Sequence, residues 1–292
     1  MTADTSKTAD FPLFVSAGDI LTDLVRMRDS QWISHPGGAG WNVARAVARL
    51  GVPSACAGAL GLDCFSDELW NASAAAGLDM RFMQRVERAP LLAIVHETQP
   101  PAYFFIGDAS ADLAFDPELL PEGWMQAVQW AHFGGISLAR QPLGATLATL
   151  AAELRARGVK ISFDPNYRNL MEHGYRPTLE TMVALADVIK VSDEDLRCLF
   201  RTDEETALET LRTMNGDAAI MVTRGAGAAT LLAREETIEA LPPRVAVVDT
   251  VGAGDASIAG LLFSLMRRPQ REWREHLSFA LAAGAAACRF AG

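Results

Sequence analysis

Short apolar runs alternate with helix-length amphipathic stretches along most of the chain. The helical pattern PLGATLATLAAELRARG leads to the strand-like VKISFDPN, and the strand-like DVIKVS leads to DEDLRCLF, which begins a helix. Strands that alternate with helices favour a mostly parallel sheet covered by helices on both faces. The pattern therefore predicts a three-layer α/β/α fold that binds ligands at the carboxyl ends of its strands. Acidic, hydroxyl and glycine residues stand at these predicted ends: Asp19, Gly134, Gly135, Asp164, Ser192, Gly225 and Gly252.

Residues 79–115 interrupt this alternation. RFMQRV, LLAIVHET and AYFFIG are short strand-like pieces separated by proline and polar turns, with no helix-length pattern between them. The interval predicts a small antiparallel sheet attached to an α/β domain that spans residues 11–292. The polar residues 1–10 are typical of a flexible tail.

The composition excludes several classes of function. With 292 residues, 50% of them hydrophobic, the chain can bury one large core, and its formal net charge of −10 argues against nucleic acid as a partner. No apolar run approaches the roughly 18 residues that cross a bilayer, and the N-terminus has no apolar signal core. The four cysteines lack metal-ligand spacing. We therefore expect a soluble, cytoplasmic protein with free thiols and no membrane contact.

The stretch VVDTVGAGDAS, residues 247–257, predicts an anion-binding loop. It lies between the apolar VAVV, which we expect to form a strand, and the helical SIAGLLFSLM. Backbone N–H groups at the start of a helix attract anions, and small residues let a phosphate approach the backbone. Asp255 follows the loop directly, where its carboxylate can accept a proton from an attacking hydroxyl group. A plain glycine turn with Asp255 as a helix cap is the alternative.

A second glycine loop precedes a helix near the N-terminus. In HPGGAGWNVARAVARLG, Gly37 and Gly38 allow a ligand to contact the backbone, and Asn42 offers a hydrogen-bond donor and an acceptor. Asp19, at the end of the first predicted strand, can reach the same place. A carboxylate beside an amide suits a polyol ligand, although a flexible loop before a capped helix would contain the same residues.

Neither glycine loop matches two common nucleotide-binding motifs. The chain has no GxxxxGK[ST] phosphate loop, and in GAGDAS the third glycine of a dinucleotide fingerprint is replaced by Ser257. This loop also lies far from the first strand, where an oxidoreductase would place it. The sequence therefore disfavours a nicotinamide-dependent oxidoreductase.

Together, the two stretches resemble the ribokinase-like (PfkB) family of carbohydrate kinases, over about residues 11–292. DTVGAGD is the more specific family signature, and the glycine pair with Asn42 precedes it in the family's order; KVSDEDL and TRGAGA are further similar pieces. The resemblance implies a ribokinase-like α/β/α fold with a small β-sheet lid, formed mainly by residues 79–115. It also implies transfer of the γ-phosphoryl group of ATP to a hydroxyl group of a sugar or nucleoside.

The same resemblance implies a role for each candidate residue. Asp255 is the catalytic base beside an anion hole made by the backbone N–H groups of Gly252, Ala253 and Gly254. ATP with Mg²⁺ is the phosphoryl donor, and many members also bind a monovalent cation such as K⁺. The implied ligands are Asp19, Gly37, Gly38 and Asn42 for sugar hydroxyl groups, Ser192, Asp195, Thr223, Gly225 and Gly227 for ATP and Mg²⁺, and Asp249 with the Val251 carbonyl for K⁺.

Two stretches indicate the acceptor. FDPNYRNLM resembles the fructokinase and 2-keto-3-deoxygluconate kinase branches, and the Arg168 guanidinium suits sugar hydroxyl groups, a carboxylate or ATP phosphates. AYFFIGDASAD resembles the fructokinase lid, which makes Tyr103, Phe105 and Asp112 candidates for sugar contacts. Arg168 could equally pair with a structural acid, and the aromatic residues could belong to a core. Fructose is the first choice, 2-keto-3-deoxygluconate the second and a nucleoside the third; a non-catalytic sugar or nucleotide sensor is the alternative of a different class.

The strand-rich lid also bears on assembly. Open strand edges invite pairing between chains, so we expect a homodimer.

Overall fold

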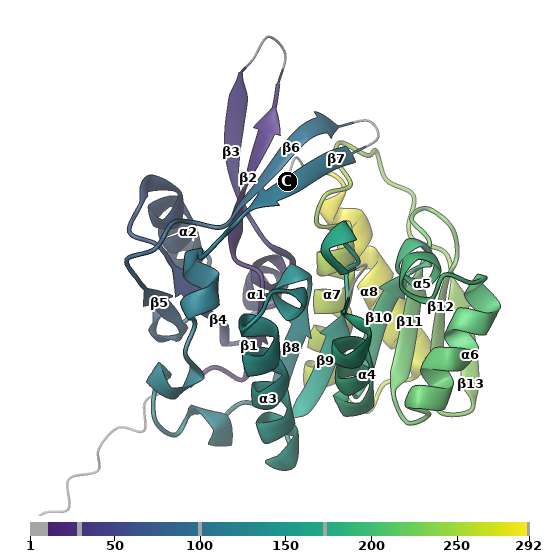
Figure 1. The fold of residues 1–292 in the computed structure, drawn as a ribbon. Helices are drawn as coiled ribbons and strands as arrows, with labels where there is room; N and C mark the ends of the chain where they lie inside the picture. The colour runs from purple at the N-terminus through teal and green to yellow at the C-terminus, as the bar shows by residue number, and fades with distance from the viewer. Residues whose placement is uncertain (1–10, 28–30, 99–100, 172–173, 291–292) are drawn as a thin grey trace, which may run out of the picture.

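The computed structural model describes residues 11–27, 31–98, 101–171 and 174–290, which form a large and a small sheet with surrounding helices (Figure 1). The large sheet has nine strands in the order β13-β12-β11-β10-β9-β8-β1-β4-β5. Neighbours from β11 to β5 are parallel, whereas β12 and β13 run antiparallel at one edge. The strands are β1 (Phe14–Ala17), β4 (Ser54–Leu60), β5 (Met83–Arg85), β8 (Trp130–Gly134), β9 (Lys160–Asp164), β10 (Val188–Ser192), β11 (Ala219–Thr223), β12 (Ala229–Ala233) and β13 (Glu236–Ala240).

The carboxyl ends of the parallel strands meet at one edge of this sheet. Gly134 of β8 is in register with Asp164 of β9, and Ser192 of β10 is in register with Thr223 of β11. The strands between these ends are continuous apolar runs because both of their faces are covered. The polar ends of these parallel strands therefore lie along one edge, as predicted from the sequence, whereas Gly252 does not directly follow a strand.

Helices cover both faces of the large sheet, which confirms the predicted three layers. Leu147 and Leu154 of α3 share a buried cluster with Phe163 of β9, whereas Val47 of α1 and Ile258 of α7 belong to a separate cluster on the other face. No helix in the described part of the chain is both long and apolar enough to cross a membrane. The helices are α1 (Ala39–Arg49), α2 (Cys64–Ala75), α3 (Leu143–Ala156), α4 (Arg176–Leu185), α5 (Asp193–Phe200), α6 (Glu204–Met214), α7 (Ala253–Arg267) and α8 (Trp273–Ala287).

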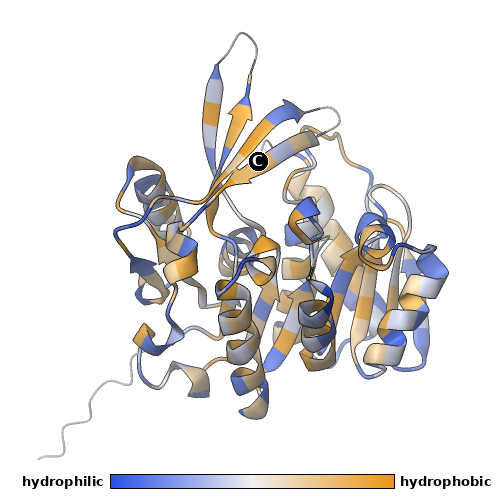
Figure 2. Ribbon diagram, in the orientation of Figure 1, coloured by the Kyte–Doolittle hydropathy of each residue, from blue (hydrophilic) through white to orange (hydrophobic). Residues whose placement is uncertain are grey.

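The small sheet projects from the α/β body and has the strand order β3-β2-β6-β7 (Figure 1). Strands β2 and β3 are an antiparallel hairpin, β6 and β7 are another, and β2 runs parallel to β6. Figure 2 shows hydrophobic residues, in orange, along much of β2, β6 and β7. The strands are β2 (Leu21–Arg26), β3 (Trp32–Gly37), β6 (Leu92–Thr98) and β7 (Pro101–Ile106).

This small sheet differs from the one predicted within residues 79–115. That interval supplies β6 and β7, but β5 joins the large sheet beside β4, and residues 21–37 supply the other two strands. The segment LTDLVR does not have a strand pattern of its own because half of it is polar, and its pairing with β6 is distant in the sequence. Part of the predicted loop HPGGAG likewise belongs to β3.

Two local predictions are wrong. The apolar VAVV forms no strand: no regular element lies between Ala240 and Ala253, and Val247 and Val248 are 61% and 65% exposed. Apolar residues make a strand only where a partner edge is available, and here Val248 N–H instead donates to Cys288 O. The stretch SDELWNASAAAG predicts a helix that begins at Ser66, but α2 begins at Cys64, because the Asp63 side chain caps it.

Candidate active site

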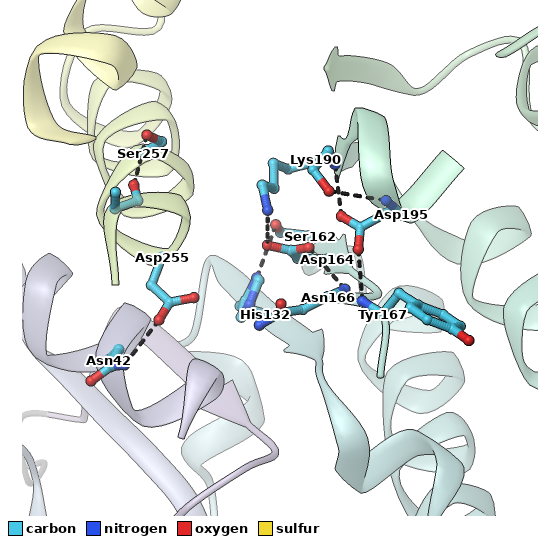
Figure 3. Close-up of polar contacts among 12 residues, drawn as sticks. Asn42, His132, Ser162, Asp164, Asn166, Tyr167, Lys190, Asp195, Asp255 and Ser257 are labelled. Atoms are coloured by element: carbon cyan, nitrogen blue, oxygen red, sulfur yellow. Dashed lines mark hydrogen bonds and ion pairs between the residues drawn. The ribbon is translucent and has the colours of Figure 1, made fainter. Parts of the chain in front are cut away.

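Asp255 lies beside an amide from the opposite end of the chain. In the first turn of α7, its Oδ2 accepts a hydrogen bond from Asn42 Nδ2 of α1 at 2.9 Å (Figure 3). Burial raises the pKa of the Asp255 carboxyl group, and the Asn42 hydrogen bond and the Lys190 charge oppose this rise. Its other oxygen accepts no hydrogen bond from a described residue. That oxygen is therefore available to a hydroxyl group of a ligand.

The glycine loop before Asp255 presents backbone N–H groups. Gly252 has a left-handed φ of 75°, which turns the chain into α7 and which favours glycine. Ala256 N–H bonds to Gly252 O, whereas the N–H groups of Gly252 and Gly254 donate to no described residue. The Ala253 N–H donates to Thr250 O at 3.2 Å. Of the three N–H groups predicted to form an anion hole, two are thus open and one closes the turn.

A buried ion pair lies opposite this loop. Lys190 Nζ of β10 is 3.0 Å from Asp164 Oδ2 of β9, and both side chains are almost fully buried (Figure 3). A Cβ atom added to Gly254 would lie 3.2 Å from Lys190 Nζ, so the ammonium group approaches the start of α7 closely. Asp164 is one of the predicted strand-end residues, whereas Lys190 was not predicted as a site residue, although KVSDEDL contains it.

The Asp19 carboxylate is held by backbone groups. Its Oδ2 accepts the Ile136 N–H at 3.0 Å and its Oδ1 accepts the Ser137 N–H at 2.7 Å. Burial raises the pKa of Asp19, and these hydrogen bonds oppose the rise. Gly135 leaves the space that this carboxylate fills, because a Cβ atom there would overlap it. Asp19 thus joins the end of β1 to the turn after β8.

Asp23 is a site residue that sequence reasoning missed. It lies on β2, and a Cβ atom on Gly37 would overlap its Oδ2, so a side chain at position 37 would displace this carboxylate. Burial raises the pKa of Asp23 to about 6; the Arg168 charge lowers this pKa, and the Asp255 and Asp19 charges raise it further. An acid at an inward alternate position of LTDLVR, between two apolar residues, is the signal that could have identified it.

Arg168 joins the small sheet to the large one. Its Nη1 donates to Asn166 O, Asn166 Oδ1 and Tyr167 O, and its guanidinium carbon lies 5.7 Å from the centre of the Tyr103 ring. Tyr103 and Phe105 make an edge-to-face contact, with ring centres 5.7 Å apart. The structure therefore brings these three predicted residues together with Asp23 on one side of the small sheet.

Ser192 and Asp195 form a capping box at the start of α5. The Ser192 hydroxyl accepts the Asp195 N–H at 3.0 Å, and Asp195 Oδ2 accepts the Ser192 N–H at 2.7 Å. Asp195 Oδ1 accepts the Tyr167 N–H at 2.7 Å, which fixes the loop that carries Arg168. Through these hydrogen bonds, Ser192 and Asp195 stabilise the start of α5, and Asp195 also holds the loop of Arg168.

The remaining candidates lie on turns farther along the sheet edge. Thr223 ends β11, Gly225 has a left-handed φ of 55° with open space beside it, and Gly227 N–H donates to Arg224 O. In the loop before α7, Asp249 Oδ1 accepts the Val251 N–H at 3.1 Å. The described residues include no cluster of three His, Cys, Asp or Glu side chains that could hold a metal ion.

Comparison with known proteins decides the family. Residues 13–292 match the model of the pfkB family carbohydrate kinase. The chain belongs to this family. This kinase is 31% identical over 281 residues to a fructokinase of Escherichia coli, covering 92% of this chain and 91% of that protein. It is also 31% identical over 258 residues to an aminoimidazole riboside kinase of Salmonella typhimurium, covering 86% and 80% of the two chains.

Solved structures resemble the kinase over nearly its whole length. The fructokinase with bound ATP from Xylella fastidiosa has a TM-score of 0.87 and 28% identity, covering 97% of this chain and 94% of that one. The aminoimidazole riboside kinase from Salmonella enterica, complexed with aminoimidazole riboside and an ATP analogue, has a TM-score of 0.83 and 30% identity, covering 95% and 94%. The ribokinase-like fold expected from the sequence is confirmed.

Proposed function

We propose that this kinase transfers the γ-phosphoryl group of ATP to a sugar hydroxyl group, with Asp255 as the general base. The observation that carries the proposal is the Asp255 carboxylate, which has one oxygen held by Asn42 and the other open, directly after a loop whose Gly252 and Gly254 N–H groups are also open. The acceptor oxygen forms a bond to phosphorus, its proton passes to Asp255, and the bond to ADP breaks. The open N–H groups bind the phosphoryl oxygens as their charge develops.

The nucleotide is proposed to lie along the strand ends from β10 to β11. Thr223, Gly225 and Gly227 form the turn that would face it, and the open space beside Gly225 fits this role. Bound Mg²⁺ neutralises phosphate charge, and Asp195 with Ser192 would stand nearest to it. Because the described residues lack a three-carboxylate cluster, phosphates and water would supply most of the metal ligands.

A monovalent cation site is proposed in the loop before α7. Asp249 and the Val251 carbonyl would bind K⁺ next to the anion hole. Hydrogen bonds hold this loop in place: Asp249 Oδ1 accepts the Val251 N–H, and the N–H groups of Val248 and Asp249 donate to Cys288 O.

Fructose is the proposed acceptor, and the fructokinase relatives support it. Asp23, Asn42 and Arg168 supply acceptors and donors for several hydroxyl groups, and Tyr103 closes the side of the small sheet. Asp19, Gly37 and Gly38 would shape the floor. Two other acceptors have specific support: Arg168 suits the carboxylate of 2-keto-3-deoxygluconate, and the aminoimidazole riboside kinases suggest a nucleoside.

The small sheet is proposed to act as a lid and as a dimer interface. Asp23, Tyr103 and Phe105 lie on its inner face, whereas Phe104, Ile106 and Trp32 lie on the outer face and are 52%, 52% and 44% exposed. Apolar side chains of this size on an exposed face favour contact with a second copy of the chain, and β3 and β7 also present open edges.

The deciding experiment measures ADP release with Mg-ATP and K⁺ across fructose, 2-keto-3-deoxygluconate, ribose, tagatose and nucleosides. Asp255→Asn is expected to lower kcat on the preferred acceptor by roughly two orders of magnitude or more. Asp67→Asn is the matched control, because Asp67 also lies in the first turn of a helix but is exposed. Nucleotide binding without turnover on any acceptor would favour a sensor, and full activity of Asp255→Asn would remove its role as base.

A further inference from the structure

Lys190 is unusual in this chain. Of the 26 lysines and arginines, only Lys7, Lys160 and Lys190 are lysines. Lys190 is 5% exposed, and it is the one buried lysine or arginine within the ranges that the structure describes. Burying an ammonium group lowers the stability of the fold unless an anionic partner offsets the lost hydration. Lys190 therefore needs an anionic partner close to its ammonium group.

Lys190 forms an ion pair with Asp164. This pair does not use all three N–H donors of the Lys190 ammonium group. The Nζ atom lies 3.0 Å from Asp164 Oδ2, with the two side chains 6% and 4% exposed. An ammonium group has three N–H donors, and no other hydrogen bond joins Lys190 Nζ to a described side chain. Two donors are therefore available to a ligand.

The ammonium group faces the anion hole. Its distance of 3.2 Å from a Cβ atom built on Gly254 places it directly across from the first turn of α7. Figure 3 shows Nζ directed at the Asp164 carboxylate, with Asp255 on the neighbouring helix α7. A Cβ atom at position 254 would crowd the ammonium group, so the glycine leaves room for the lysine beside the start of α7.

The surroundings keep Lys190 charged. Burial alone lowers the pKa of its ammonium group, but the negative charges of Asp164, Asp195 and Asp255 outweigh burial and raise this pKa above its ordinary value. On the other side, burial and the Lys190 charge lower the pKa of His132 to about 3, so this histidine is neutral and hydrogen-bonds to Ser162 Oγ at 3.1 Å. Lys190 is thus the fixed positive charge at this end of the site.

We infer that Lys190 is a catalytic residue that donates hydrogen bonds to the non-bridging oxygens of the transferring phosphoryl group, with Asp164 as its anchor. The inference rests on the proposed phosphoryl transfer. During the step the acceptor oxygen bonds to phosphorus, its proton passes to Asp255, the bond to ADP breaks, and Lys190 keeps its protons. Negative charge moves toward the hydroxyl acceptor, where the carboxylates Asp23, Asp164 and Asp255 would otherwise repel it.

A purely structural ion pair makes a different prediction. If the pair only stabilised the fold, removing either partner would leave one buried charge and would be about equally harmful. If Lys190 binds the phosphoryl group, its loss is far worse for turnover than the loss of Asp164, because Asp195 and Asp255 still hold its charge in Asp164→Asn. The comparison of the two variants therefore separates the two roles.

The experiment compares Lys190→Met, Asp164→Asn and the double variant with the native chain. We expect Lys190→Met to lower kcat at least 100-fold with the sugar KM changed less than threefold, and Asp164→Asn to lower kcat less than tenfold. The double variant carries no unpaired buried charge, and its kcat should stay as low as that of Lys190→Met. Lys160→Met is the matched control, because Lys160 pairs with Asp187 at 2.9 Å but is 56% exposed.

Calorimetric titration with inorganic phosphate in the presence of MgADP gives a second readout that needs no turnover. We expect Lys190→Met and the double variant to bind phosphate at least tenfold more weakly, and Asp164→Asn to bind it within threefold of the native chain. Equal losses in Lys190→Met and Asp164→Asn, or a double variant with native kcat and phosphate affinity, would overturn the inference. Phosphate binding that depends on Lys190 in a chain that phosphorylates no acceptor would instead contradict the proposed function alone.

Discussion

Asn42 and Asp255 are 213 positions apart in the sequence, and Asn42 Nδ2 donates a hydrogen bond to Asp255 Oδ2 at 2.9 Å. The bond joins the starts of α1 and α7, the two helices that follow the glycine loops. It favours the ionised carboxylate and orients it, so that the oxygen on the other side is presented to a ligand. The two sequence motifs thus act on one functional group.

Replacing this amide should change the pH dependence of the reaction. The Asn42 hydrogen bond lowers the pKa of Asp255, so Asn42→Ala should raise that pKa and move the acidic limb of the kcat profile to higher pH. We also expect kcat at neutral pH to fall by roughly tenfold. The measurement is a pH–kcat profile. Asn71→Ala on the exposed side of α2 should leave the profile unchanged, and an unmoved acidic limb in Asn42→Ala would contradict the prediction.

Asp23 should weaken the fold at neutral pH. Its folded pKa of about 6 exceeds its ordinary value of 3.8, so the group favours folding below that ordinary value and this advantage is lost as pH rises through 6. Asp23→Asn should therefore be more stable than the native chain at pH 8, by at most about 3 kcal/mol, and equally stable near pH 4. Thermal unfolding at both pH values tests this.

The same variant should bind sugar poorly, with a KM raised at least roughly tenfold through the loss of an anionic acceptor. A variant that loses stability at pH 8 would show that burial of the Asp23 charge is offset by contacts that the carboxylate makes.

Gly135 should tolerate no side chain. Its φ is 65°, and a Cβ atom there would overlap the Asp19 carboxylate that accepts the Ile136 and Ser137 N–H groups. Gly135→Ala should lower the free energy of unfolding by about 2 kcal/mol more than Gly158→Ala does. Gly158 is the control because its φ of 86° is also left-handed but its Cβ would meet nothing within 4 Å. Urea unfolding of both variants measures the difference, and equal values would contradict the overlap.

The outer face of the small sheet should set the oligomeric state. If a second copy covers Phe104 and Ile106, Phe104→Asp with Ile106→Asp should convert a dimer to a monomer, because buried charges without partners oppose association. Light scattering at assay concentration measures the mass. Leu119→Asp changes an apolar residue that is 70% exposed outside this sheet and should leave the mass unchanged. A native chain that is already monomeric would contradict the proposed dimer.

Patterns local to the chain were sufficient for most of the fold. The alternation of apolar runs and amphipathic stretches predicted the three layers, because the spacing of apolar residues within a short segment distinguishes a strand from a helix. The same patterns failed at β2, whose partner β6 lies more than fifty residues further on, at β3, which pairs only with β2 among the described strands, and at VAVV, which has no partner edge. Strand pairing depends on contacts between segments that are distant in the sequence, so it cannot be predicted from the pattern of one short segment.

The site divides in the same way. The two glycine loops and the acid at position 255 can be predicted from the sequence alone, since left-handed turns and open helix starts need particular residues at fixed spacing. The contact of Asn42 with Asp255, the binding of the Asp19 carboxylate by two backbone N–H groups and the approach of Lys190 to Gly254 depend on the tertiary structure. These facts depend on burial and on which strand ends lie side by side, and those properties arise only when segments distant in the sequence pack together.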